Sequence, residues 1–183
     1  FDAINTNTGN ATANITGTDY TAAHLKTIND GISGAIVIAT PTATLEDSAA
    51  DLVDAFAGTV TTHTGEITIT DAPTVAQLKA INAATSGAIV LDVPGGALEG
   101  SVADILLALA GSITTHTGTV TITDDTGVDI TATDITFINT EATGTIVVQN
   151  AIDINGSGSE VAAAVTAINT HSGATTANIT GTD

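Results

Sequence analysis

Cysteine is absent from the 183 residues of this chain. The protein therefore has no disulfide framework, no metal site built on thiolates and no thiol nucleophile. Basic residues are almost absent too, because Lys26 and Lys79 stand against 20 acidic residues and the formal net charge is −18. Such a surface repels nucleic acid and anionic membranes and attracts cations, so we expect no nucleic-acid partner.

Long apolar runs are also missing. No run reaches the roughly 18 residues that a membrane span needs, and no signal peptide is recognisable. The chain lacks an initiator methionine and starts inside a phrase that recurs later, so we expect a mature fragment or a section of a longer chain. Apolar residues still make up 43% of the sequence, enough to bury a continuous core. We therefore expect a folded chain.

What the sequence does contain is internal repetition. TTHTGEITITD at residues 61–71 returns as TTHTGTVTITD at residues 114–124, and residues 1–19 align without gaps on residues 165–183 with 13 of 19 positions identical. An active site is needed once, whereas a building unit is needed many times, so the pattern predicts a repeat protein. The predicted divisions are the end of a preceding repeat (1–9), three repeats (10–65, 66–118 and 119–173) and the start of a following repeat (174–183).

The first half of a repeat is predicted to be a strand and a helix. Residues 66–71 alternate Ile with Thr, which is the period of a strand with one buried face. A helix is predicted over residues 74–87, where Thr74 and Gln77 form a capping box and Gly87 ends the helix. Its predicted buried face consists of Val75, Leu78 and Ile81. Equivalent first strands are predicted at residues 13–19 and 119–124.

The second half repeats this order with a more apolar strand at residues 88–93. Ser101 and Asp104 then cap a second helix. Its predicted buried stripe consists of Ile105, Leu106, Leu109 and Ile113. The same cap is predicted for the equivalent helices, by Ser48 with Asp51 and by Ser157 with Glu160. The glycines predicted to end these second helices are Gly65, Gly118 and Gly173. Equivalent second strands are predicted at residues 35–39 and 145–150.

Strands that alternate with helices lie parallel, because each crossover returns the chain to the same end of the sheet, and such crossovers are right-handed. Repeating this step puts all helices on one face. The predicted fold is therefore α/β: a right-handed α/β solenoid of strand-helix-strand-helix units with a parallel sheet and helices on one face. A doubly wound sheet is the competing prediction, but the Thr-rich first strands disfavour it, since a sheet between two helix layers is apolar on both faces.

The recurring histidines are predicted to be structural. His63, His116 and His171 are placed in the last turn of the second helix, where an imidazole reaches free carbonyls. A shared metal ion is disfavoured, because two strands per repeat separate successive histidines by about 10 Å. His24 is explained as a local helix cap. No nucleophile-elbow motif accompanies them, so the chain is predicted not to be an enzyme.

Aspartates and asparagines recur in the same way. The aspartates that end the first strands are predicted to bond the backbone of the following turn: Asp19, Asp71, Asp124 and Asp183. The loop at residues 124–129 is longer than its counterparts, and Asp124, Asp125 and Asp129 are candidate calcium ligands there. No other cofactor is predicted. One asparagine per repeat is predicted to bond backbone at a fixed place: Asn29, Asn82 and Asn139.

The outward strand face is the predicted interaction surface. Threonines of the first strands and valines of the second strands are expected to line up across the sheet, which suits lateral packing between fibres, glycan contact or ice binding. The residues of this predicted surface are Thr16, Thr18, Thr68, Thr70, Thr121, Thr123, Val37, Val90 and Val147.

The phrase ITDAPTVAQLKAINAATSGAIVLDV at residues 69–93 resembles the units of giant tandem-repeat, Thr-, Ala- and Asp-rich, adhesin-like surface proteins of cyanobacteria and other aquatic bacteria. The resemblance covers essentially all 183 residues, although residues 124–150 depart from it through the longer loop and Phe137. It implies secretion, a place at the cell surface and calcium binding, and it transfers no catalytic residue.

Together these features predict a structural protein that forms, or belongs to, an extracellular fibre, filament or cell-surface stalk. Its predicted partners are copies of itself, joined head to tail and packed laterally, because a solenoid leaves strand edges open at both ends. The alternative is a binding module, an adhesin that uses the Thr-rich face for glycan or ice.

Overall fold

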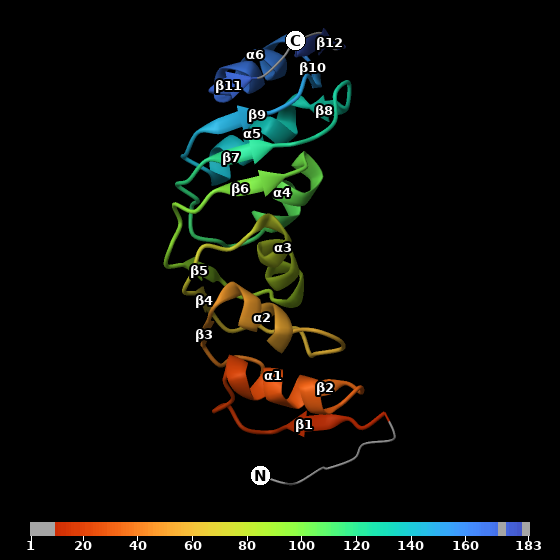
Figure 1. The fold of residues 1–183 in the computed structure, drawn as a ribbon, viewed down its shortest axis with the longest axis vertical. Helices are drawn as coiled ribbons and strands as arrows, with labels where there is room; N and C mark the ends of the chain where they lie inside the picture. Colours follow the sequence, from red (N-terminus) through yellow and green to blue (C-terminus); the bar gives the residue numbers. More distant parts are fainter. Residues whose placement is uncertain (1–9, 172–174, 181–183) are drawn as a thin grey trace.

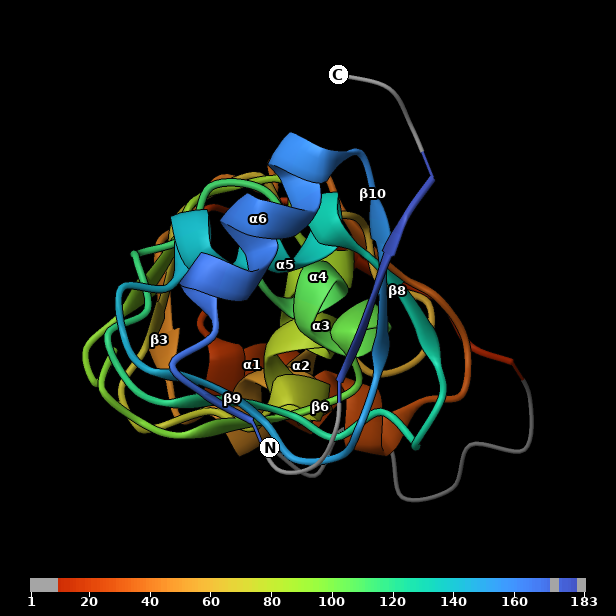
Figure 2. The same ribbon diagram turned by 90° about the horizontal axis from the view of Figure 1, so that it is seen from above.

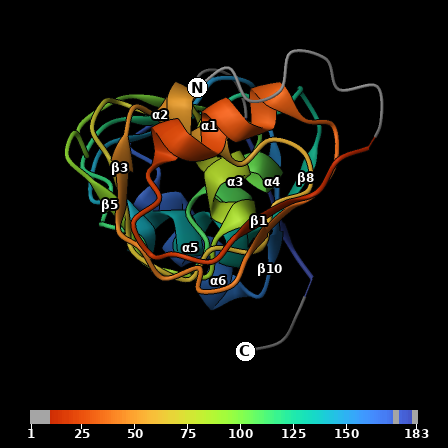
Figure 3. The ribbon, with the colours of Figure 1, turned by 90° about the horizontal axis from the view of Figure 1, so that it is seen from below.

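The computed structural model describes residues 10–171 and 175–180. Its elements follow one another in chain order along the long axis, with β1 (Ala13–Ile15) near one end and β12 (Thr176–Ile179) near the other (Figure 1). Each helix and the extended segment before it form one layer. Seen along the long axis, the helices lie over one another and the extended segments pass around them (Figures 2 and 3).

The described residues form six helices, and each one packs against the next. They are α1 (Ala22–Gly31), α2 (Ala49–Ala55), α3 (Val75–Ala84), α4 (Val102–Ala108), α5 (Ala132–Glu141) and α6 (Gly158–Ala167). The predicted caps are confirmed: Thr74 and Gln77 form a capping box on α3, and Ser101 accepts the backbone N–H of Asp104 on α4. Ser48 caps α2 in the same way, and Ser157 forms a capping box with Glu160 on α6.

All strand pairs are parallel, as predicted, and the fold class is α/β. Between β1 and β12 lie β2 (Ile36–Ile38), β3 (Leu45–Asp47), β4 (Ile67–Ile69), β5 (Ile89–Leu91), β6 (Leu98–Gly100), β7 (Val120–Ile122), β8 (Asp129–Thr131), β9 (Ile146–Val148), β10 (Asp153–Gly156) and β11 (Thr170–His171). The two predicted strand types share a sheet, because β4 pairs with β5 and β7 pairs with β9.

The sequence predicts a parallel sheet and leaves open whether the two strand types form one sheet or two; in the structure the described strands do not form a single stack. The described strands belong to four sheets, in the orders β1-β2, β3-β4-β5, β6-β7-β9-β11 and β8-β10-β12. The cause is that paired strands follow one another at a shorter spacing along the chain than successive helices do. Ile67 pairs with Ile89, 22 residues later, whereas α3 and α4 begin 27 residues apart. From one layer to the next, a row of paired strands therefore lies farther ahead of the helix in the chain. After two to four strands the row ends, and a new row of strands begins closer to the helix.

Isoleucine, leucine, valine and alanine side chains from strands and helices form one buried cluster. The predicted face of α3 is confirmed, since Val75, Leu78 and Ile81 are all buried. Ile105 on α4 and Leu109 directly after it are buried, while Leu106 is half-buried. Ile113 lies beyond this helix and bridges to Ile89.

The predicted helix ends are wrong. The three helices in question end at Ala55, Ala84 and Ala108, so Gly65, Gly87 and Gly118 lie outside them. Each of these glycines instead lies against a carbonyl of the preceding layer. An added Cβ would stand 2.3 Å from the Ala43 oxygen at Gly65, 1.9 Å from the Gly65 oxygen at Gly87 and 2.1 Å from the Gly96 oxygen at Gly118. Gly173 lies outside the described residues.

Candidate functional site

The outward-facing strand residues form mixed rows across neighbouring layers. In one row Thr68 lies beside Glu46 on one side and Val90 on the other. A second row has Thr121 between Glu99 and Val147. The predicted neighbours are thus side by side, but each row also contains a glutamate, so the face is acidic as well as hydroxylic.

The remaining members of the predicted surface are dispersed. Val37 is 43% exposed and pairs with Asn14 at the β1 end of the molecule. Thr16 and Thr18 are exposed beyond the end of β1, and Thr70 is exposed just after β4. Thr123 follows β7 and is half-buried. The rows belong to different sheets and do not merge into one flat array.

The helix-end prediction for the histidines is wrong. His63 and His116 lie eight residues after the last residues of α2 and α4, in extended segments that bridge to Thr85 and Ala142. The cause is that the second helices are only seven residues long. His171 is exposed in β11.

His63 is fully buried and connects three layers. Its Nε2 lies 2.9 Å from the carbonyl oxygen of Ala43, and its Nδ1 lies 3.4 Å from the hydroxyl of Tyr20. The ring of Phe56 packs against it with a centroid separation of 5.9 Å. Burial lowers the pKa of His63, although the Ala43 carbonyl opposes this by favouring the protonated form. The residue is therefore a neutral imidazole that donates to backbone.

The recurring phrase His-Thr-Gly clamps a turn of the preceding layer. While His63 bonds Ala43, the backbone N–H groups of Thr64 and Gly65 both donate to the carbonyl of Pro41, at 2.8 and 3.1 Å. This clamp brings the backbones so close that only glycine fits at position 65.

The second copy of the clamp has the same backbone bonds as the first but, among the described residues, lacks the histidine bond. Thr117 and Gly118 donate to the carbonyl of Pro94, at 2.8 and 3.2 Å. His116 is 2% exposed, and burial lowers its pKa while the Gly96 carbonyl opposes the shift. Its Nε2 has no hydrogen bond of normal geometry within the described residues. These two histidines are thus buried in the contacts between layers rather than at the ends of helices.

Two of the recurring aspartates bridge layers as well. The carboxylate of Asp71 accepts the backbone N–H of Ala49 at 2.7 Å, and that of Asp124 accepts the N–H of Val102 at 2.7 Å. Ala49 and Val102 are the first residues of α2 and α4, so each carboxylate caps the helix of the preceding layer. The position of these aspartates at strand ends predicts a bond to the following turn instead, and that prediction is wrong for Asp71 and Asp124. Asp183 lies outside the described residues.

The recurring asparagines bond backbone as predicted at two of the three positions. Asn29 donates to the carbonyl of Asp54, and Asn82 donates to that of Leu107, both at 2.8 Å. These carbonyls lie in the last turn of the short helices α2 and α4, and the Asp54 carbonyl also accepts the backbone N–H of Ala57 at 3.3 Å. Asn139 faces the longer helix α6 and lies beside a hollow.

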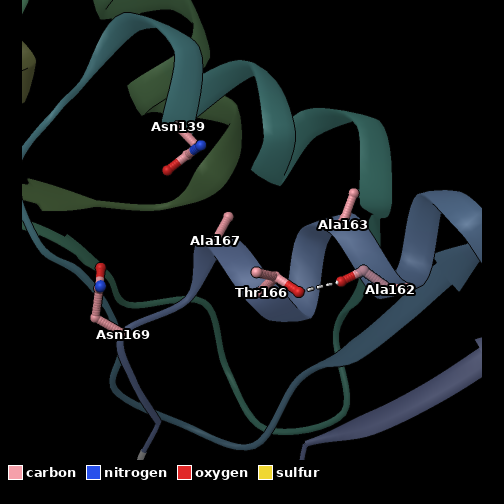
Figure 4. Close-up of a pocket in the computed structure, with 6 residues that line it drawn as sticks. All are labelled: Asn139, Ala162, Ala163, Thr166, Ala167 and Asn169. Atoms are coloured by element: carbon pink, nitrogen blue, oxygen red, sulfur yellow. Dashed lines mark hydrogen bonds between the residues drawn. The ribbon is translucent and has the colours of Figure 1, made fainter.

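That hollow, of about 520 Å³, lies between α5 and α6 (Figure 4). Thr166 in its wall bonds the carbonyl of Ala162 in its own helix. No ionisable side chain lines the hollow, so it offers no general acid or base. Its lining residues are Asn139, Ala162, Ala163, Thr166, Ala167 and Asn169.

The candidate calcium ligands do not converge in the structure. Asp124 is bonded to Val102, and Asp129 accepts the side-chain amide of Asn155. Asp125 is exposed in the loop between them. Among the residues that the structure describes, no group of three or more His, Asp or Glu side chains is arranged to hold a metal ion.

Both lysines pair with aspartates of the next helix. Lys26 on α1 bonds Asp54 and lies 3.6 Å from Asp51, and Lys79 on α3 lies 2.5 Å from Asp104. The bond to Asp54 raises the pKa of Lys26, and Lys79 lowers the pKa of the Asp104 carboxyl. The only two basic side chains of the chain are thus engaged between helices, and the rest of the surface is acidic.

No helix within residues 10–171 and 175–180 has the length and hydropathy to cross a membrane. Comparison with protein families, with curated proteins and with solved structures gives no match to this chain.

Proposed function

We propose that the chain is a section of an α/β solenoid that serves as a structural element of an extracellular fibre or cell-surface stalk. In this proposal the layers continue head to tail beyond both ends, in a longer chain or in stacked copies. The function is mechanical continuity, and no catalysis is assigned.

The observation that carries the proposal is the recurrence of the same contacts between layers. Thr64 with Gly65 and Thr117 with Gly118 bind the carbonyls of Pro41 and Pro94 in the same way, 53 residues apart. The aspartate caps recur with the same spacing, at Asp71 and Asp124. Contacts that join only neighbouring layers are typical of repeat proteins, in which each unit lacks a complete core of its own.

The chemistry of the surface also supports a structural role. The ionisable side chains with a shifted pKa are ion-paired at the surface or buried between layers. Asp104 also lines a hollow of about 420 Å³ with Lys79 and Glu99, and its carboxylate is paired with Lys79 there. The hollow between α5 and α6 is lined by alanine, threonine and asparagine. The hollow between α5 and α6 therefore lacks the convergent ionisable groups of a catalytic site.

Electron microscopy tests the proposal. We expect the purified chain to appear as rods of uniform width that lengthen into fibres with rising concentration, or the intact mass of the natural polypeptide to be several times larger than 18.0 kDa. Discrete, compact particles together with an intact mass near 18.0 kDa would contradict it.

A second candidate function is binding by the outward rows. The side-by-side placement of Thr68 with Val90 and of Thr121 with Val147 favours it, because such rows present hydroxyl and methyl groups on one face. Glycan-array binding or inhibition of ice recrystallisation tests this function. We expect the Thr68→Lys/Thr121→Lys double variant to lose the binding, whereas a Thr27→Lys variant on the helix side keeps it.

A further inference from the structure

The last described strand, β12, pairs with β10 along one edge only. The N–H of Thr176 donates to the carbonyl of Ile152, and the N–H of Thr180 donates to that of Gly156, both at 2.9 Å. Backbone groups alternate in direction along a strand, so the N–H of Ala177 and the carbonyl of Ile179 point away from β10. No strand within the described residues pairs with this second edge.

The first described strand shows what such an edge binds. Residues 12–15 and residues 176–179 are the same tetrapeptide, Thr-Ala-Asn-Ile. In β1 the N–H of Ala13 donates to the carbonyl of Ala35, and the carbonyl of Ile15 accepts the N–H of Ala39, both at 2.9 Å. Ala13 and Ile15 correspond to Ala177 and Ile179, so the edge that β1 uses to bind β2 is the edge that β12 leaves open.

Two interior junctions repeat this bonding pattern. Ile67 donates to Ala88 while Ile69 accepts from Asp92, at 2.9 and 3.0 Å. Val120 donates to Thr145 while Ile122 accepts from Gln149, at 2.8 and 2.9 Å. Three of the four strands of this kind therefore bind a following strand in one register.

The exposure of the core-facing side chains agrees with an incomplete junction. Ile69 and Ile122, which have a following layer, are 0% exposed, whereas Ile179 is 65% exposed. Ile154, which lies beside Ala177 in the sheet, is buried on the same face. Ile179 is thus an apolar residue at the rim of a core that the described layers leave open.

We propose that the open edge of β12 is a docking site for one parallel strand of the β2 kind, an Ile-Val-Ile segment supplied by a further copy of this repeat. Its register places Ala177, Asn178 and Ile179 opposite the residues that correspond to Ile36, Val37 and Ile38. The two isoleucines of the incoming strand cover Ala177 and Ile179, as Ile36 and Ile38 are covered in the chain itself (1% and 3% exposed). This inference rests on the proposed function, and it identifies β12 as the end of the solenoid to which the next repeat is added.

A peptide of residues 33–41 with added lysines and a fluorophore, titrated with the purified 183-residue chain, tests the site by anisotropy. We expect saturable binding of one peptide per chain. A matched peptide with the Ile36→Thr and Ile38→Thr changes keeps the backbone but loses the apolar contacts, and should bind at least about tenfold more weakly.

Two proline variants of the protein locate the edge. Ala177→Pro removes the N–H that points to the open edge and leaves the bonds to β10, so peptide binding should weaken at least about tenfold while the circular dichroism spectrum is unchanged. Asn14→Pro is the matched control, because it removes an N–H on the opposite, outer edge of β1, and binding should persist. Absence of binding, or equal binding by Ala177→Pro and the unaltered chain, would overturn the assignment.

The result is separable from the proposed function. Rods seen by microscopy in a chain that binds no peptide would leave the solenoid proposal standing and refute the β12 site. Peptide binding that Ala177→Pro abolishes supports the site even where the free chains remain single particles.

Discussion

Gly87 lies directly against the backbone carbonyl of Gly65 in the preceding layer. An added Cβ at Gly87 would stand 1.9 Å from that oxygen, and Gly144 repeats the contact at 1.8 Å from the carbonyl oxygen of Gly118. A carbonyl belonging to a paired backbone cannot rotate away as a flexible side chain can. Glycine at these positions therefore sets the spacing between layers.

The first prediction concerns this close approach. We expect Gly87→Ala to lower the free energy of unfolding by about 3 kcal/mol, because the methyl group forces two paired segments apart. Urea denaturation followed by circular dichroism measures the change. Gly31→Ala is the control, since nothing lies within 4 Å of its added Cβ and alanine suits the end of α1, so stability should stay equal or rise slightly. Equal stability of the two variants would contradict the close contact.

The second prediction concerns the cap between layers. Asp124→Ala removes the acceptor of the Val102 N–H at the start of α4 and should cost about 1–2 kcal/mol of unfolding free energy. The neighbouring Asp125 is exposed, so Asp125→Ala should change stability by less than about 0.5 kcal/mol. A loss of similar size in both variants would point to the charge of the loop rather than to the cap.

The third prediction concerns calcium. Because Asp124 and Asp129 are bonded to Val102 and Asn155, we expect the thermal melting curve to be the same in calcium and in excess chelator. A melting temperature that falls on chelation, and that becomes insensitive to calcium in Asp125→Asn, would instead establish the loop at residues 124–129 as a calcium site.

Local structure could be predicted from the sequence because its causes are local. The Thr74 and Gln77 capping box, the Ser101 cap and the face formed by Val75, Leu78 and Ile81 depend on residues within two helical turns of one another. The parallel direction of the strands also followed from the alternation of strands and helices.

Contacts between layers could not be predicted in the same way. His63 and Ala43 are 20 residues apart, and Asp71 and Ala49 are 22 apart, so no local period connects them. Both side chains were assigned nearby roles, a helix end and a turn. The sequence nonetheless contained a signal for this contact. Pro41 and Pro94, which begin the two turns, are 53 residues apart, as are His63 and His116, and this shared spacing indicates that each turn contacts the segment of one histidine.

The fourth prediction separates two asparagines that the sequence treats as equivalent. Asn82→Ala leaves the Leu107 carbonyl without its side-chain donor and should cost about 1 kcal/mol. Asn139 lies at the hollow beside α6, whose ten residues extend past the equivalent carbonyl, so Asn139→Ala should cost less than about 0.5 kcal/mol. Equal losses in the two variants would show that Asn139 also bonds backbone.

The fifth prediction concerns pH. Burial lowers the pKa of both His63 and His116 in the folded chain, whereas in the unfolded chain their pKa is about 6.5. Unfolding therefore takes up protons below that pH. The stability that the neutral histidines provide is fully present above pH 6.5 and is lost as the pH falls toward their folded pKa, with a slope of up to about 1.4 kcal/mol per pH unit for each histidine.

Urea denaturation at intervals between pH 8 and pH 5 measures this slope. The His63→Gln/His116→Gln double variant should flatten it, because glutamine does not titrate and at position 63 still offers an N–H to the Ala43 carbonyl. His24→Gln is the control, since His24 is exposed on α1 and its loss should leave the slope unchanged. An equally steep slope in the double variant would assign the pH dependence to carboxylates whose pKa is lowered in the folded chain, such as Asp104 beside Lys79.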